Sequence, residues 1–282
     1  MKIQKAAGHY QPFDRDKFVS SLLKSGVPKR FVLHLSRQAE RLEPKLRNTD
    51  QLFDFAHQEL AQKDRKSAMR YSLKRAVFEL GPTGFPFEQY VARLLDRLGY
   101  RTQTNVYVRG YCVSHEVDIL AWKGKKTHLI ECKFHSYRGI KTNVKIVLYV
   151  KARVEDIDRA LVAGADTDRQ AQPQKIDQAW LITNTKHTIE AEKYARCAGI
   201  HLVSWGYPAG AGLESLIEKT RLYPVTALLH LDRAFKKRLV SLGLVTAEDV
   251  VNFSQWNKVT PSEKNRIREL QKDGRLLLRN NE

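Results

Sequence analysis

Two short apolar runs joined by a glycine turn constrain the fold of this chain more than any other feature. Residues 115–134 read HEVDILAWKGKKTHLIECKF, with Gly124 and Lys125 between the runs. A two-residue turn with glycine at its first central position is typical of an antiparallel β-hairpin. Such a turn sets Lys123 opposite Lys126 and thereby fixes the register of both strands.

In that register the hairpin brings charged residues together near its open end. Asp118 falls opposite Glu131, and Lys133 shares a face with Glu131 because side chains alternate along a strand. Opposed carboxylates destabilise a sheet unless water, a lysine or a bound cation offsets their charge. Two carboxylates suit Mg²⁺ or Mn²⁺, and an adjacent lysine can orient an attacking water or stabilise charge on phosphate. The pattern therefore contains the groups for phosphodiester hydrolysis, with a solvated Glu–Lys strand face as the alternative interpretation.

The charge of the chain indicates the kind of partner. Lysine and arginine number 49 against 31 acidic residues, which gives a formal net charge of +18 in 282 residues. An excess of this size favours a polyanion, either nucleic acid or an anionic membrane surface. No apolar run approaches the roughly 20 residues that a membrane span needs. We therefore expect DNA as a partner and no association with a membrane.

Cysteine usage and the first residues bear on the compartment. Cys112, Cys132 and Cys197 are odd in number and form no CxxC pair. This pattern favours reduced thiols over disulfides or a zinc site. The opening residues lack the apolar core of a signal peptide. The expected location is the cytoplasm.

The apolar periodicity divides the chain into three predicted domains. Residues 1–82 predict a short strand pair followed by helices, and the break GPTGFP ends this part. Residues 83–221 predict an α/β domain with a mixed sheet flanked by helices. Residues 222–282 predict a small helical domain, with Thr246 and either Thr260 or Ser262 as N-caps.

The middle domain resembles a known nuclease family. The resemblance rests on GFPFEQYVARLLDRLGYRTQTN, on the strands HEVDIL and LIECKF, and on QAWLITNTKHTIEAEKYARCAGIHLVSW, in that order. These segments are similar to the Mrr-type restriction endonucleases of the PD-(D/E)XK superfamily. The resemblance implies a restriction-endonuclease-like fold and a Mg²⁺- or Mn²⁺-dependent endodeoxyribonuclease. Cleavage of both strands commonly requires two active sites, so a homodimer is also expected.

The same resemblance assigns roles to individual residues. Asp118 and Glu131 would be metal ligands, Lys133 the catalytic lysine, and Glu88 an additional acidic contributor from the opening helix. A solvent-facing position on that helix is the alternative for Glu88. After the lysine strand, many members of the family carry Gln or a second polar pair, whereas this sequence reads FHSYRG. His135 is the candidate that would substitute for the missing polar residue.

The amino-terminal domain resembles the ATP-cone, a small nucleotide-sensing module. The similarity rests on KIQKAAGHYQPFDRDKFVSSLLKSG, NTDQLFDFAHQEL and AMRYSLKRAVFEL. It implies ATP or dATP as a regulator, with Lys5 and Lys17 at the phosphates, Asp14 at the base or sugar, and Thr49 at a helix start. Cations and a helix N-terminus both suit phosphate. The alternative is a helical domain that contacts DNA or a partner without binding nucleotide.

Three classes of function remain open on the sequence. They are a metal-dependent DNA endonuclease, a DNA-binding protein that keeps the nuclease fold without cleavage, and a nucleotide-responsive regulator. The set of Asp118, Glu131 and Lys133 favours the first over the second, because binding alone needs no opposed carboxylates. The positive charge disfavours the third, which needs no polyanion.

Overall fold

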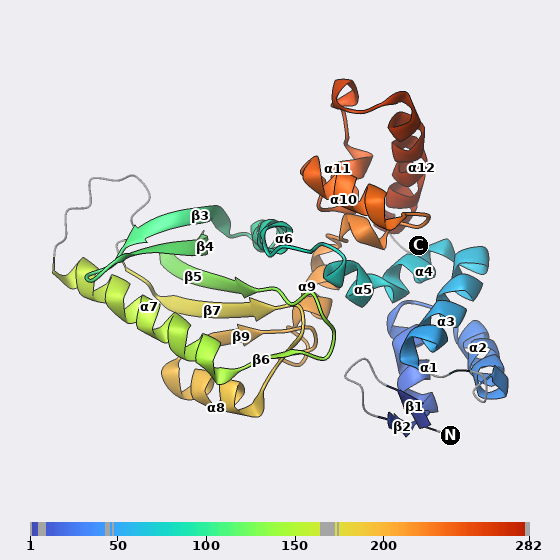
Figure 1. The fold of residues 1–282 in the computed structure, drawn as a ribbon, viewed down its shortest axis with the longest axis horizontal. Helices are drawn as coiled ribbons and strands as arrows, with labels where there is room; N and C mark the ends of the chain where they lie inside the picture. Colours follow the sequence, from blue (N-terminus) through green and yellow to red (C-terminus); the bar gives the residue numbers. More distant parts are fainter. Residues whose placement is uncertain are drawn as a thin grey trace. The chain divides into compact units, whose positions relative to one another are not determined.

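The chain divides into two units, which are described separately (Figure 1). Unit 1 comprises Met1–Glu79 and Tyr223–Glu282, and unit 2 comprises Leu80–Leu222. The computed structural model describes residues 2–4, 10–42, 46, 48–163, 173 and 175–279. Within these ranges no helix has both the length and the apolar character that a membrane crossing demands. The three cysteines are free thiols.

Unit 2 is built on a five-stranded mixed sheet, as the sequence predicts. In spatial order its strands are β3 (Arg101–Arg109), β4 (Ser114–Lys123), β5 (Lys126–Lys133), β7 (Gln178–Thr183) and β9 (His201–Val203). The first three are antiparallel neighbours, whereas β5, β7 and β9 run parallel. A parallel pair needs a long crossover connection, and helices supply it here.

Helices cover both faces of this sheet (Figure 1). They are α6 (Phe85–Arg97), α7 (Val144–Val162), α8 (Ile189–Ala198) and α9 (Leu213–Thr220), and the short strands β6 (Lys141–Thr142) and β8 (Lys186–His187) pair with each other. Val147 and Val150 of α7 share a buried cluster with Ala191 of α8 and Leu181 of β7. The helix α6 packs against β3, β4 and β5 with α9 beside it. Its buried residues recur at the spacing of one helix face, as in an amphipathic helix.

The hairpin of β4 and β5 has the predicted turn. Lys123 pairs with Lys126, and the ladder continues in register to Ile119 and Ile130. Gly124 has a φ of 60°, a left-handed conformation that glycine adopts without steric cost. The turn chemistry therefore sets the register that the sequence predicts.

Beyond this ladder, β3 and β4 change faces together. Val117 packs in the same buried cluster as Leu120, although a regular strand would place residues three apart on opposite faces. The change falls at Asp118 of β4 and at Asn105 of β3, where the ladder between them skips a pair and Asn105 has a φ of 54°. Asparagine tolerates this conformation better than most residues. Because of this break, the Asp118 side chain does not follow the regular alternation of side chains between the two faces of the sheet.

Unit 1 is mainly helical. Its elements are the paired strands β1 (Lys2–Gln4) and β2 (Tyr10–Pro12), the helices α1 (Arg15–Lys24), α2 (Lys29–Leu42), α3 (Thr49–Lys63), α4 (Arg65–Tyr71) and α5 (Leu73–Phe78), and then η2 (Val225–Ala227), α10 (Arg233–Ser241), α11 (Ala247–Val251), η3 (Trp256–Lys258) and α12 (Pro261–Leu278). Thr246 and Thr260 cap α11 and α12 with complete capping boxes, so the predicted caps are confirmed, with Thr260 rather than Ser262 at the second.

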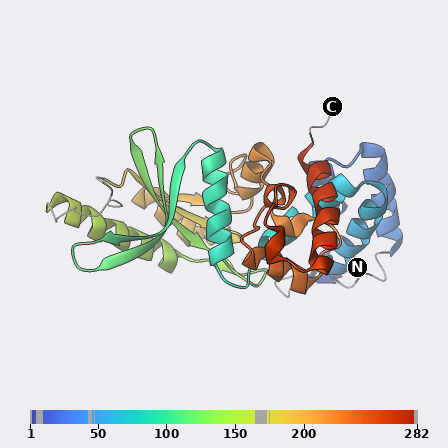
Figure 2. The same ribbon diagram turned by 90° about the horizontal axis from the view of Figure 1, so that it is seen from above.

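The first and last segments of the chain form one unit, whereas the sequence suggests two separate domains. The helix α12 packs on α4, and η2 packs on α5. Figure 2 shows the red C-terminal helix beside the cyan helices of the first segment. The Thr226 hydroxyl donates to the Ala76 carbonyl at 2.6 Å, and Arg65 pairs with the buried carboxylate of Asp273 at 2.5 Å. Periodicity identifies these helices but does not report which distant segment buries their apolar faces.

Candidate active site

The Asp118 carboxylate reaches across to the neighbouring strand. The sequence predicts Asp118 directly opposite Glu131, but the ladder ends one pair earlier. Instead, the backbone N–H of Cys132 donates to Asp118 Oδ2 at 2.7 Å. Cys132 stands between Glu131 and Lys133, so this bond places the Asp118 carboxylate beside both. The Asp118 side chain thus accepts a hydrogen bond that a backbone carbonyl would accept in a regular ladder.

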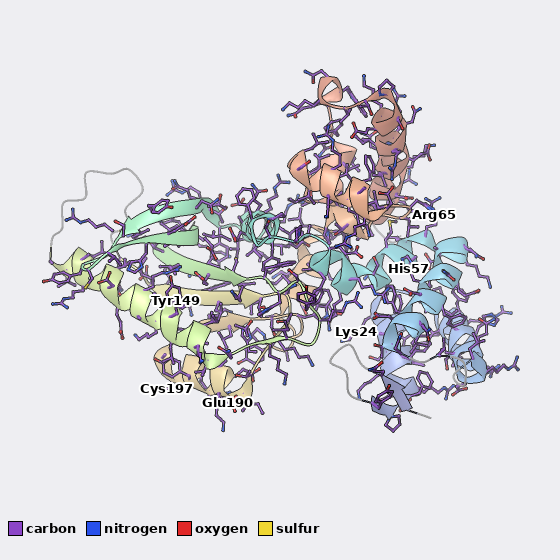
Figure 3. The ribbon with its side chains drawn as sticks, viewed as in Figure 1. Lys24, His57, Arg65, Tyr149, Glu190 and Cys197 are labelled. Carbon is purple, nitrogen blue, oxygen red and sulfur yellow. The ribbon has the colours of Figure 1, made fainter. Side chains whose placement is uncertain are left out.

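Glu131 is held by an arginine that the sequence analysis does not identify. Arg153 of α7 is 7% exposed, and its Nη1 lies 2.5 Å from Glu131 Oε2. Its Nη2 donates to the hydroxyl of Tyr149 at 2.6 Å, and Figure 3 labels Tyr149 on α7. The signal for Arg153 is its place among Val150 and Ile157 on the buried stripe of the helix. A charged residue in an apolar stripe requires a partner.

Glu88 lies at the same end of the sheet. It is half-buried in the first turn of α6, and a Cβ at Gly84 would come within 2.9 Å of its Oε1. The Phe87 ring lies 5.7 Å from that of Phe134, which follows β5 directly. The beginning of α6 therefore adjoins the end of β5. This position differs from the fully solvent-facing alternative.

The three carboxyl groups influence one another electrostatically. Burial, together with the charges of Asp118 and Glu131, raises the pKa of Glu88 to about 7. Burial and the Asp118 carboxylate raise the pKa of Glu131, whereas Arg153 and Lys133 oppose this change. Burial also raises the pKa of Asp118, while the hydrogen bond from Cys132 lowers it. This end of the sheet therefore carries negative charge that its own cations do not fully offset.

The donor set can be compared with what a metal requires. In the part of the chain that the structure describes, no three or more His, Cys, Asp or Glu side chains gather into a metal-binding group. Asp118 and Glu131 remain a two-carboxylate set, and Mg²⁺ commonly binds one or two carboxylates and retains several waters. Burial, and for Glu131 also the charge of Asp118, raises the pKa values of these carboxyl groups, and a bound cation would favour their charged forms. The residues thus fit a hard divalent cation, with Glu88 outside its immediate ligands.

Lys133 is half-buried at the end of β5. Its alternation in the strand puts it on the face of Glu131. The Thr183 hydroxyl donates to the Lys133 carbonyl at 2.7 Å, and β7 pairs with β5 up to this residue. The backbone that carries the lysine is therefore fixed from the β7 side.

His135 has a structural role in the segment after Lys133. Its N–H donates to Asn184 Oδ1, and its carbonyl accepts from Asn184 Nδ2, both at 2.9 Å. Its Nε2 lies 2.9 Å from the Thr142 hydroxyl. Burial and the Lys133 charge lower its pKa. These contacts place His135 in the base of a loop, so nothing in the geometry assigns it the missing family position.

The residues expected at a nucleotide site lie in unit 1. Lys5 falls outside the described residues. Asp14 caps α1, accepts from the Lys17 N–H at 3.0 Å and pairs with Lys17 Nζ at 2.7 Å. Thr49 is the first residue of α3, as expected, and Asn48 is its N-cap. A bridge between Gln4 and Asn48 sets β1 beside the start of α3. The structure thus brings Asp14 and Lys17 together as an exposed local pair.

Comparisons with known proteins agree with this architecture. Residues 82–206 match the Mrr_cat family model, described as a restriction endonuclease. An uncharacterized protein of Archaeoglobus fulgidus is 40% identical over 165 residues, which cover 58% of this chain and 86% of that protein. The crystal structure of AF1548, a protein of unknown function, superposes with a TM-score of 0.56 at 35% identity, covering 70% of this chain and 98% of the other.

The matched range defines a restriction-endonuclease domain in residues 82–206. The chain belongs to the same family as the uncharacterized Archaeoglobus fulgidus protein. The MspJI restriction endonuclease, solved with a 27-mer oligonucleotide, aligns at a TM-score of 0.32 and 15% identity over 61% of this chain and 40% of its own. A likeness at that level carries no argument about this protein.

Proposed function

We propose that this protein is a metal-dependent DNA endonuclease that hydrolyses phosphodiester bonds. The observation that carries the proposal is the 2.7 Å hydrogen bond from Cys132 N–H to Asp118. It brings the Asp118 carboxylate to the strand that bears Glu131 and Lys133. The match of residues 82–206 to a restriction-endonuclease model supports the same reading. Fold alone would leave the activity open, so the proposal rests on the site residues.

In the proposed mechanism, Asp118 and Glu131 hold Mg²⁺ or Mn²⁺. When bound, the cation supplies Lewis-acid chemistry at the phosphodiester. Lys133 orients the attacking water and stabilises negative charge on the phosphate. Glu88 contributes an additional acidic group from the start of α6. Arg153 holds Glu131 in place through the 2.5 Å ion pair, so that one carboxylate oxygen stays oriented.

The basic surface supports DNA as the substrate. The net charge of +18 suits a phosphate backbone, since lysine and arginine release counterions when they bind it. Two active sites commonly serve cleavage of both strands, so a homodimer is part of the proposal. We place this activity in the cytoplasm.

A plasmid assay tests the activity. Supercoiled plasmid is incubated with the protein and Mg²⁺ or Mn²⁺, with EDTA and Lys133→Ala as controls. We expect nicked or linear DNA with the wild type and metal, and neither product in the controls. Nicking that persists in both controls, or no cleavage of any DNA offered, would refute the assignment.

Regulation by ATP or dATP is a further part of the proposal. Lys5, Asp14, Lys17 and Thr49 are the candidate residues, and the position of Thr49 at the start of α3 supports phosphate at a helix N-terminus. Titration of ATP is compared for the wild type, Lys17→Ala and, as a control on the same helix, Lys24→Ala. We expect only Lys17→Ala to weaken binding. Equal weak binding by all three would reject the nucleotide site.

One observation favours a second candidate, a DNA-binding protein without cleavage. Arg153 already places a positive charge on Glu131, and this ion pair offsets part of the charge that a metal would otherwise neutralise. Isothermal titration of Mn²⁺ separates the two candidates. Metal binding that Asp118→Asn abolishes favours the nuclease. DNA binding with no metal binding and no cleavage favours the second candidate.

A further inference from the structure

The segment that follows Lys133 forms a loop whose two ends meet at one hydroxyl group. Thr183 Oγ1 donates to the Lys133 carbonyl at 2.7 Å and lies 3.2 Å from the Thr142 hydroxyl, which donates to it. Thr142 also accepts from the N–H of Thr188 through its carbonyl at 3.0 Å. Both ends of residues 134–142 are therefore fixed to the β7 side of the sheet.

The base of this loop is fixed as well. The Asn184 side chain is fully buried and makes two 2.9 Å hydrogen bonds to the backbone of His135. The Ser136 hydroxyl donates to the Pro82 carbonyl at 3.2 Å. A polar side chain that is buried for two backbone hydrogen bonds holds the loop in one conformation.

The tip of the loop exposes apolar side chains. Tyr137 is 75% exposed and Ile140 is 44% exposed, and Gly139 between them has a φ of 88°. An anchored loop that leaves an aromatic ring in water gains little stability from that ring. Binding residues are often carried on loops that a rigid scaffold positions.

The chemistry around the tip suits a nucleic acid. Residues 132–150 contain four lysines and arginines and no aspartate or glutamate. Aromatic rings within a basic groove are the pattern of single-stranded nucleic-acid binding, where bases stack on the rings and cations hold the backbone. The segment from Cys132 onward thus offers both groups next to the catalytic strand.

The distance along the chain places this ring near the reacting phosphate. Tyr137 follows Lys133 by four residues, so their Cα atoms are at most roughly 14 Å apart. Phosphates in one strand of duplex DNA rise about 3.4 Å each along the axis. A DNA strand at Lys133 therefore passes within a few nucleotides of Tyr137.

We propose that Tyr137 stacks on the base of an unpaired nucleotide close to the scissile phosphate, while the basic segment around it holds the backbone. The inference rests on the proposed function and deepens it, because it assigns a class of substrate. An aromatic ring stacks fully only on a base whose face is open, so the favoured DNA has unpaired nucleotides at the cleavage site. Because the loop is already held in one conformation, little conformational entropy is lost when the ring binds a base.

Binding is measured in the Lys133→Ala background with EDTA, so that no DNA is cut. Fluorescence anisotropy with a labelled single-stranded oligonucleotide and its duplex gives both affinities. We expect Tyr137→Ala to weaken single-strand binding by about tenfold and duplex binding by less than about twofold. Tyr137→Phe keeps the ring and should stay within about twofold of the parent. Tyr111→Ala removes an exposed tyrosine at the tip of the β3–β4 hairpin and should change neither affinity.

Two results would overturn the inference. One is single-strand binding that Tyr137→Ala leaves unchanged, and the other is an equal loss on duplex DNA. The test is independent of cleavage. If the protein with Lys133 intact cuts no DNA while single-strand binding still depends on Tyr137, the proposed nuclease activity fails and the stacking contact stands.

Discussion

The backbone N–H of Cys132 donates a hydrogen bond of 2.7 Å to the carboxylate of Asp118. One side chain thus fastens β4 to β5 at the point where their ladder ends and also forms part of the candidate metal site. An amide oxygen can accept the same bond but carries no charge. A substitution at Asp118 can therefore remove the charge of the proposed metal ligand while it keeps the hydrogen bond between the strands.

We expect Asp118→Asn to fold and to lose activity. Its free energy of unfolding should stay within about 1 kcal/mol of the wild type, since the hydrogen bond is kept. Metal-dependent cleavage should fall by about 100-fold or more, because a metal ligand has lost its charge. Urea denaturation and plasmid cleavage measure the two effects. Glu155→Gln, at an exposed carboxylate on α7, is the control and should cleave normally. Full activity in Asp118→Asn would contradict the assignment.

Arg153→Met should destabilise unit 2 strongly. The substitution leaves Glu131 half-buried without its ion-pair partner, and breaking a buried pair costs about 3–5 kcal/mol. The loss should be smaller at pH 6 than at pH 8, because an unpaired Glu131 can take up a proton. Urea denaturation followed by tryptophan fluorescence measures it. Lys151→Met removes an exposed pair with Glu155 on the same helix and should cost less than about 1 kcal/mol. Glu131→Gln in the Arg153→Met background should recover part of the loss.

His187 should make unit 2 less stable in mild acid. It is 4% exposed, and neither ring nitrogen has a hydrogen-bond partner among the described residues. Burial, together with the charge of His135, lowers its pKa to about 4. Between pH 6.5 and pH 4 the unfolded chain therefore binds the proton and the folded chain does not, so stability falls as pH falls through this window.

The size of this effect can be isolated by substitution. Between pH 7.5 and pH 5, His187 should reduce the free energy of unfolding by about 2 kcal/mol. His187→Leu cannot take up a proton, so its stability should fall less steeply over the same range. Urea denaturation of both proteins at the two pH values gives the comparison. Identical pH dependence would show that His187 contributes nothing.

Residues 1–82 should not fold as an independent domain. Met69 and Val77 are fully buried in a unit that includes η2 and α12, and the hydrogen bond from Thr226 to Ala76 belongs to the same packing. We expect the fragment to lack a cooperative thermal transition by circular dichroism. Adding a fragment of residues 223–282 should restore helix content and cooperativity. A cooperative transition of the first fragment alone would support the three-domain division.

Local chemistry made much of the architecture predictable. The turn at Gly124 gave the hairpin register, and Thr246 gave a capping box. The mixed sheet followed from the order of elements. Each of these depends on residues within a few positions of one another, which is the range over which sequence patterns report structure.

Contacts between distant segments were not predictable in this way. Arg153 contacts Glu131, which stands 22 positions earlier in the chain, and only its place in an apolar stripe indicates a partner. The β4–β5 ladder was expected to continue through Asp118 opposite Glu131, but it ends at Ile119 and Ile130. The β3–β4 ladder also skips a pair at Asp118, where its partner Asn105 is left-handed. The packing of η2 and α12 on α4 and α5 joins the two ends of the chain, and no local pattern encodes it.

The joint change of face at Asn105 and Asp118 also gives a way to locate such carboxylates. Apolar residues on the α7 side of β4 occupy an odd position at Val117 and even positions at Leu120 and Trp122. The core thus shifts parity where the aspartate stands. One inserted or deleted residue on either side of the aspartate would move every side chain in that half of the strand to the opposite face of the sheet. The apolar pattern therefore constrains the position of the carboxylate. A switch of the apolar residues from odd to even positions around an acidic residue in a strand can therefore identify such carboxylates in the sequences of relatives.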